Sequence, residues 1–69
     1  MTLIQLIELF YDGYDDKVYI DLYEGSDAAP IFSDIRIIDG QLRNYYNRKI
    51  IGLFESSRLS IIVERDKNA

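Results

Sequence analysis

Hydrophobic residues near the start of the chain recur at the spacing of an α-helix. Residues at positions i, i+3, i+4 and i+7 share one face of a helix, and the apolar residues at this spacing are Leu3, Leu6, Ile7 and Phe10. Thr2 is a suitable N-cap, and Gln5 three residues later completes a capping box. The pattern predicts a helix over about residues 2–11, with Gly13 as the residue after its C-terminus.

Two later segments alternate between apolar and polar residues, which is the pattern of half-buried strands. In residues 17–24, one face carries Val18, Ile20 and Leu22, and the other carries Tyr19, Asp21 and Tyr23. In residues 31–38, one face carries Ile31, Ser33, Ile35 and Ile37, and the other carries Phe32, Asp34, Arg36 and Ile38. The Gly-Ser-Asp-Ala-Ala-Pro segment between them predicts a turn or loop.

The second half of the chain predicts a short helix and a β-hairpin. Asp39 can cap a helical turn within residues 41–47, whose inner side carries Leu42, Tyr45 and Tyr46. Residues 48–64 alternate on both sides of a Ser-Ser pair, as the two strands of a hairpin do. Gly52 interrupts the first of these strands, which indicates a bulge or a close approach of another group.

This order of elements predicts one α+β domain over residues 1–64. The N-terminal helix is expected to pack on a small four-stranded, mostly antiparallel sheet, and residues 65–69 to form a frayed polar tail. The other face of the sheet would carry Tyr19, Asp21, Tyr23 and some of Ile50, Phe54 and Ile62. Such a face is either an interface or is covered by the short helix or a loop, and the sequence leaves both open.

Composition narrows the possible chemistry. The 69 residues include neither Cys nor His, which excludes disulfides, thiolate zinc sites and the commonest catalytic base. The serines have no histidine to activate them, and the four isolated glycines form no phosphate-binding loop. We therefore expect no enzymatic activity and no cofactor. The N-terminus has no signal-peptide pattern and no apolar run reaches membrane length, so a cytoplasmic protein is expected.

Two charged clusters leave alternatives open. An EF-hand loop has glycine at its sixth position, whereas Gly13 directly follows Asp12, so this segment is not an EF-hand. A weaker Ca²⁺ or Mg²⁺ site could still form from Asp12, Asp15 and Asp16. A basic and aromatic cluster could bind nucleic acid locally, and it comprises Arg43, Tyr45, Tyr46, Arg48 and Lys49. The overall negative charge disfavours that interaction. The alternative is that the two tyrosines seal the edge of the core while the cations stay in water.

Charge is distributed unevenly along the chain. The net charge is -4, with -7 over residues 1–40 and +3 over residues 41–69. Residues 11–27 are acidic and rich in tyrosine, which gives large contact area at low entropic cost, and carboxylates steer a protein toward a basic partner. The candidate partner-binding residues are Asp12, Tyr14, Asp15, Asp16, Tyr19, Asp21, Tyr23, Glu24 and Asp27. Alternatively, Tyr11 and Tyr14 pack on the core and the acids only increase solubility.

Four segments of the chain resemble known proteins, namely residues 2–7, 17–20, 48–55 and 58–63. On these segments the chain resembles short acidic proteins encoded by phages and mobile elements of low-GC Gram-positive bacteria. In that group a Thr-Leu-x-x-Leu/Ile helix precedes two strands, a short helical turn and a final strand pair. Residues 33–36 depart from the pattern, because no proline-started helix follows them. The resemblance implies a role directed at the host, including inhibition of bacterial defence systems, and identifies no binding residue.

The sequence therefore predicts a non-enzymatic protein-binding module. Its sharpest form is a phage-encoded inhibitor of a defence nuclease, such as an anti-CRISPR or anti-restriction protein. It would block a basic, nucleic-acid-binding surface of a larger protein with an acidic face that mimics DNA. The alternative is a small structural protein that forms a homodimer or larger oligomer through the open sheet face. No membrane binding and no direct nucleic-acid binding are expected.

Overall fold

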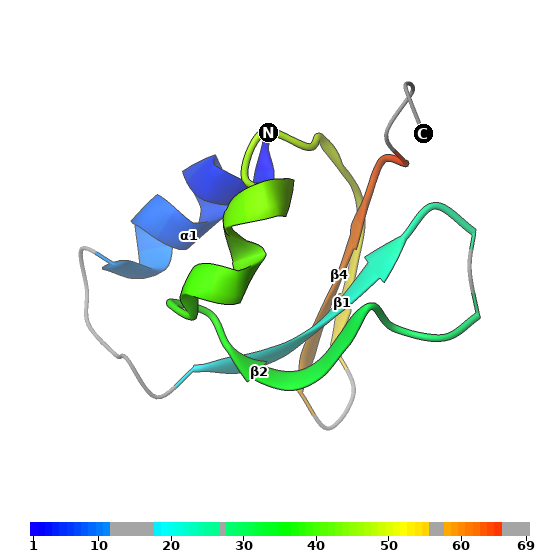
Figure 1. Cartoon of the computed structure of the whole chain (residues 1–69), viewed down its shortest axis with the longest axis horizontal. Coiled ribbons are helices and arrows are strands. Elements are labelled where there is room, and N and C mark those ends of the chain that lie inside the picture. The colour runs from blue at the N-terminus through cyan, green and yellow to red at the C-terminus, as the bar shows by residue number, and fades with distance from the viewer. Residues whose placement is uncertain (12–17, 27, 56–57, 66–69) are drawn as a thin grey trace.

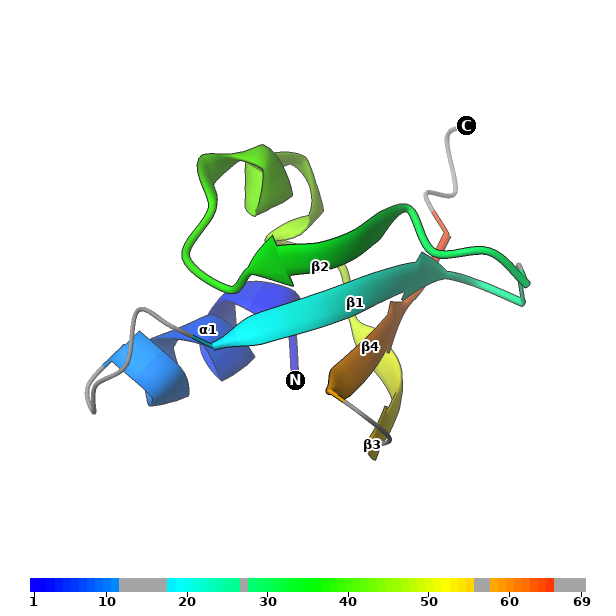
Figure 2. The same cartoon turned by 90° about the horizontal axis from the view of Figure 1, so that it is seen from below.

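The computed structural model describes residues 1–11, 18–26, 28–55 and 58–65 of the chain. The elements are α1 (Leu3–Tyr11), β1 (Tyr19–Glu24), β2 (Phe32–Arg36), the 3-10 helix η1 (Gly40–Tyr45), β3 (Ile50–Glu55) and β4 (Leu59–Val63). The four strands form one sheet in the order β2-β1-β4-β3, and both helices lie on one side of it (Figures 1 and 2). The predicted α+β arrangement is confirmed.

Two of the three strand pairs are antiparallel, as expected of a mostly antiparallel sheet. β1 pairs with β2, and β3 pairs with β4, in antiparallel fashion. The central pair, β1 with β4, is parallel, because the chain crosses the helical side of the sheet between them. Local pattern alone did not determine this pair.

The start of α1 has the predicted capping box. The backbone N–H of Thr2 donates to Gln5 Oε1 at 2.8 Å, and the N–H of Gln5 is 3.4 Å from Thr2 Oγ1. Asp39 likewise caps η1, since its carboxylate accepts a hydrogen bond from the N–H of Gln41 at 2.9 Å. The short helix predicted within residues 41–47 is therefore formed as η1, with Leu42 buried.

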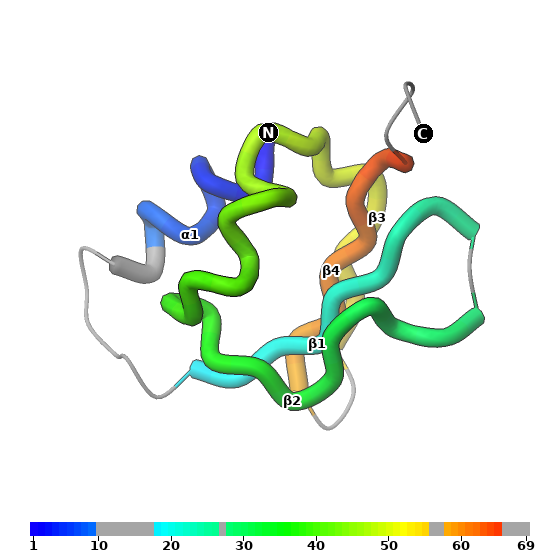
Figure 3. Tube along the Cα trace, viewed as in Figure 1, coloured from blue at the N-terminus to red at the C-terminus, as the bar shows by residue number. Residues whose placement is uncertain are grey.

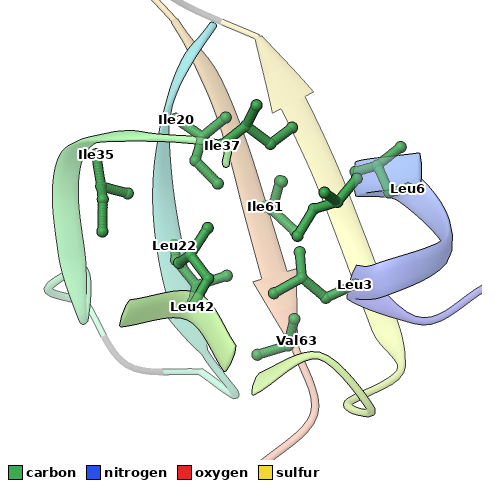
Figure 4. Close-up of a cluster of buried hydrophobic side chains, with 10 residues drawn as sticks. Leu3, Leu6, Ile20, Leu22, Ile35, Ile37, Leu42, Ile61 and Val63 are labelled. Atoms are coloured by element: carbon green, nitrogen blue, oxygen red, sulfur yellow. The ribbon is translucent and has the colours of Figure 1, made fainter. Parts of the chain in front are cut away.

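The core lies between the sheet and the two helices. Leu3 and Leu6 of α1 and Leu42 of η1 point at the sheet in Figure 4. The sheet contributes Ile20, Leu22, Ile35, Ile61 and Val63. Among the described residues, ten buried apolar side chains form one cluster, as expected of a single small core in a chain of this length. We call this side of the sheet the core face and the other side the open face.

The prediction for the second strand was wrong in its alternation. Ile20 pairs with Ile35, but Leu22 pairs with Phe32, so the register shifts between these pairs. Phe32 therefore packs against the core with Ile35 instead of pointing away from it. At the shift, Asp34 has a positive φ of 58°, and the extra residue of a bulge reverses the alternation on one side of it. Ile50, one of the three residues considered for the open face, pairs with Val63 on the core face.

Residues 1–3 run along the first part of β3. The N–H of Ile50 donates to Met1 O at 2.8 Å, and the N–H of Leu3 donates to Arg48 O at 3.0 Å. Thr2 and Lys49 form an antiparallel bridge between these bonds. Figure 3 shows the N-terminus beside the segment that enters β3. α1 is thereby fixed to the sheet at its start.

Several predictions fall outside the described residues. These concern Gly13 as the residue after α1, Lys17 in the first strand, the Ser56-Ser57 turn and the frayed end of the chain. The side chains of Phe10 and Tyr11 also lie outside the described part.

Candidate interaction surface

The open face is defined by the register of the four strands. Paired residues of neighbouring strands point to the same face of a sheet, and Ile20, Leu22 and Ile61 point to the core. The residues between them point the other way: Tyr19, Asp21 and Tyr23 of β1, Arg36 of β2, Ser60 and Ile62 of β4, and Gly52 and Phe54 of β3. The prediction that Tyr19, Asp21 and Tyr23 share this face with some of Ile50, Phe54 and Ile62 is confirmed, since Phe54 and Ile62 lie there.

An ion pair occupies the middle of the open face. Arg58 precedes β4, and its Nε donates to Asp21 Oδ1 at 2.8 Å. The backbone N–H of Asp34 donates to the same oxygen at 2.8 Å, and the hydroxyl of Ser33 donates at 3.4 Å. One carboxylate oxygen on β1 thus binds groups from both sides of the strand.

These bonds perturb the acidity of Asp21. The hydrogen bond from Arg58 is the largest cause and holds the pKa of the Asp21 carboxyl below its usual value. The bond from the N–H of Asp34 lowers the pKa further, and partial burial opposes both effects. Asp21 is therefore ionised, and its negative charge is balanced by Arg58 of the same chain.

Aromatic side chains flank this ion pair. Tyr23 and Phe54 lie with ring centroids 6.0 Å apart at an interplanar angle of 42°, within the range of favourable aromatic pairs. Tyr19 is 45% exposed and Phe54 is 47% exposed. Gly52 leaves room for the side chain of its partner Ile62, because a Cβ at position 52 would lie only 3.0 Å from Ile62 Cδ1. The sequence prediction of a bulge or close approach at Gly52 is confirmed in both respects.

Glu24 belongs to a different cluster. It lies two residues beyond Leu22, on the core face, and its carboxylate forms an ion pair with Arg48. Arg48 also donates to Glu64 O at 3.2 Å, and its guanidinium lies 4.8 Å from the ring centroid of Tyr45. The cluster ties the end of β1 to the segment before β3.

Three residues of the predicted basic and aromatic cluster are packed into the fold, whereas Arg43 and Lys49 are exposed. Tyr45 and Tyr46 are half-buried and pack against the core, as the alternative interpretation expected. Tyr45 also meets Phe32 edge to face, with centroids 5.9 Å apart. Arg48 departs from that interpretation, since it is ion-paired with Glu24 instead of free in water.

The predicted partner-binding residues are therefore divided among three places. Tyr19, Asp21 and Tyr23 lie together on the open face, and Glu24 lies on the opposite face. Outside the described residues are Asp12, Tyr14, Asp15, Asp16 and Asp27. Sequence reasoning missed Arg58, because the residue lies 37 positions from Asp21 and no local pattern relates them.

The described residues offer no group of three or more acidic, histidine or cysteine side chains that could hold a metal ion. The candidate Asp12, Asp15 and Asp16 cation site lies outside them. Within the same ranges no helix has the length and hydrophobicity needed to cross a membrane. No protein-family model, curated protein or solved structure matches the chain.

Proposed function

We propose that this chain is a non-enzymatic protein-binding module that contacts a larger protein through the open face of its sheet. The observation that supports this most directly is a sheet face opposite both helices, which carries Tyr19, Tyr23 and Phe54 together with the Asp21–Arg58 ion pair. Aromatic and arginine side chains on a rigid element are the residue types that dominate protein interfaces.

The rigidity of this surface favours binding. The Asp21 carboxylate is held by donors from β2 and from the start of β4, so its orientation is fixed before a partner arrives. The ring of Tyr23 packs against the ring of Phe54, which restricts its rotamers. A surface that is already ordered loses less side-chain entropy on association.

The finer form of the proposal is an inhibitor of a bacterial defence nuclease that acts in the cytoplasm. It is supported by the net charge of -7 over residues 1–40, which would steer the protein toward a basic partner. Asp21 and Glu24 contribute little to this field, since arginines already neutralise them. DNA mimicry would therefore rest on Asp12, Asp15, Asp16 and Asp27.

Site-specific photo-crosslinking tests the open face as the contact surface. We expect a crosslinking amino acid at position 19 to capture one larger protein in a bacterial lysate. The same residue at position 8 is the control, because Glu8 is exposed on α1, on the other side of the sheet. Capture at position 8 but not at position 19 would contradict the proposal, and crosslinks between two copies through position 19 would favour self-association through the open face.

Binding to the purified, captured partner then gives the quantitative test. Tyr19→Arg is expected to weaken binding at least about tenfold, as loss of an interface aromatic commonly does, while Glu8→Arg changes it less than about twofold. Both variants should melt at similar temperatures, because both side chains are exposed. Equal affinities of the two variants would place the contact elsewhere.

The acidic component is tested separately. Asp15→Asn with Asp16→Asn should slow association at low salt and have little effect at high salt, where charge steering is screened. Asp21 is left unchanged in this test, because its replacement would also disturb the ion pair with Arg58. If the double variant associates as fast as the wild type at every salt concentration, the hypothesis of DNA mimicry is ruled out. The proposed contact through the open face would be unaffected by that result.

A further inference from the structure

The two edges of the sheet differ in how they are protected. Natural edge strands are blunted by charges, proline or bulges, which prevent pairing with another chain. β2 has all three, since Pro30 precedes it, a bulge with positive φ lies at Asp34, and Arg36 adds a second charge. β3 also contains a bulge, between Ile50 and Gly52, but it exposes three apolar side chains: Ile51 at 54%, Leu53 at 49% and Phe54 at 47%.

The outward backbone groups of β3 follow from the hydrogen bonds of β4. The N–H of Glu64 donates to Lys49 O at 2.8 Å, so Glu64 faces β3. Residues two apart on a strand face the same neighbour, so Ile62 and Ser60 also bond to β3, at their partners Gly52 and Phe54. The N–H and C=O groups of Leu53 and Glu55 therefore point away from the sheet.

Within the described residues, the part of this edge that no other segment pairs with is short and well bounded. Residues 1–3 already pair with residues 48–50, through Ile50 N–H to Met1 O and Leu3 N–H to Arg48 O. A strand from another molecule can therefore pair only with residues 51–55. The exposed edge is apolar at Ile51, Leu53 and Phe54 and ends in the single charge of Glu55.

We propose that a second copy of this chain pairs with β3 through this edge, in antiparallel orientation, with a two-fold axis at Leu53. In this register Leu53 lies opposite Leu53 of the second copy, and the two residues exchange both backbone hydrogen bonds. Gly52 lies opposite Phe54 of the second copy in the closer type of pair, with Cα atoms about 4.5 Å apart. Both residues are on the open face, so each phenyl ring covers the backbone of a glycine.

Self-complementarity is what identifies the occupant as a second copy. An axis at Glu55 would place two carboxylates opposite each other, which is unfavourable. An axis at Ile51 would drive the added strand into residues 1–3, which already occupy that edge. The axis at Leu53 avoids both problems and places each Glu55 opposite Ile51, the extra residue of the bulge in β3. The product is one continuous eight-stranded sheet, in which the two open faces form a single surface.

Sedimentation equilibrium of the full chain, from micromolar to millimolar concentration, tests the dimer. The wild type is expected to show a monomer–dimer equilibrium. Leu53→Lys should raise the dimer dissociation constant by about tenfold or more, because it sets two ammonium groups opposite each other. Leu9→Lys is the matched control, since Leu9 is 65% exposed on α1, and it should leave the constant unchanged. A monomer at every concentration, or a dimer insensitive to Leu53→Lys, would overturn the proposal.

Isotope-filtered nuclear Overhauser spectroscopy on a mixed-label sample tests the register itself. We expect an intermolecular contact between the α protons of Gly52 and Phe54, because the closer type of antiparallel pair brings them together. A dimer that lacks this contact and instead shows contacts among Tyr19 side chains would overturn the proposal of pairing through the β3 edge. It would indicate dimerisation through the open face. Leu53→Lys changes the β3 edge and leaves Tyr19 in place, whereas Tyr19→Arg changes the open face and leaves the β3 edge in place. The proposed dimer and the proposed partner binding can therefore be disproved independently of each other.

Discussion

Asp21 connects the three strands that form the middle and one edge of the sheet. Its Oδ1 accepts hydrogen bonds from Arg58 beside β4 and from the backbone of Asp34 on β2. The second bond helps to explain the positive φ of Asp34, since the turned backbone directs its N–H at the carboxylate. The sequence predicted the correct face of the strand for Asp21 but assigned it to partner binding. It did not predict the ion pair, because Arg58 lies 37 positions away along the chain.

Acid unfolding should report this ion pair. Because the pKa of Asp21 is lower in the folded chain, its carboxylate contributes stability above the unfolded-state pKa, and this stability is lost as the pH falls through the folded-state pKa. Asp21→Asn should therefore lower the free energy of unfolding by about 1 kcal/mol at neutral pH. It should also flatten the loss of stability below about pH 4.

Urea unfolding followed by circular dichroism, repeated between neutral and strongly acidic pH, measures both effects. Glu8→Gln is the control, since Glu8 is exposed on α1. If Asp21→Asn and Glu8→Gln had the same pH profile, the ion pair would contribute nothing to folding.

At the scale of elements, local side-chain interactions determine where the helices begin. Pairing with the neighbouring strands determines the register and the faces of the strands. The capping box at Thr2 and the cap at Asp39 are both local, and both were recognised from residues within three positions of each other. The alternation of β1 predicted its two faces correctly. The alternation of β2 failed, because the bulge at Asp34 depends on a carboxylate of the neighbouring strand.

η1 should be essential to the core in spite of its length. Leu42 is fully buried and points into the cluster between η1 and the sheet (Figure 4). Leu42→Ala is expected to cost about 3 kcal/mol, through lost burial and the cavity that remains. Gln41→Ala, at an exposed neighbour, should change stability by less than about 0.5 kcal/mol. Chemical denaturation compares the two variants, and equal small effects would show that η1 packs only loosely.

At the scale of the whole molecule, the parallel pair of β1 and β4 holds the sheet together. β1 and β4 are flanked on both sides by other strands, and they supply Ile20, Leu22, Ile61 and Val63 to the core. The pair joins segments about forty residues apart, so its formation closes a long loop. The two hairpin-like pairs, β1–β2 and β3–β4, depend on this contact to share one core.

Native-state hydrogen exchange should reflect this arrangement. At low protein concentration the slowest amides are expected at Ile20, Leu22 and Ile61, because only global unfolding exposes them. Amides of Leu53 and Glu55 should exchange fast when dilute and become protected as the concentration rises. Exchange measured by nuclear magnetic resonance at two concentrations checks this pattern. Edge amides as slow as those of β4 in dilute solution would contradict it.

The sequence by itself determined the elements, the α+β class and the face to which Tyr19, Asp21 and Tyr23 point. These features follow from periodicity and capping, which act over a few residues. Only the tertiary structure decided the strand order, the parallel central pair and the Asp21–Arg58 and Glu24–Arg48 ion pairs. Every strand offers the same backbone N–H and C=O groups, so these groups do not by themselves select its neighbours. The choice among pairings depends on which apolar faces are buried together, and that is a property of the complete chain.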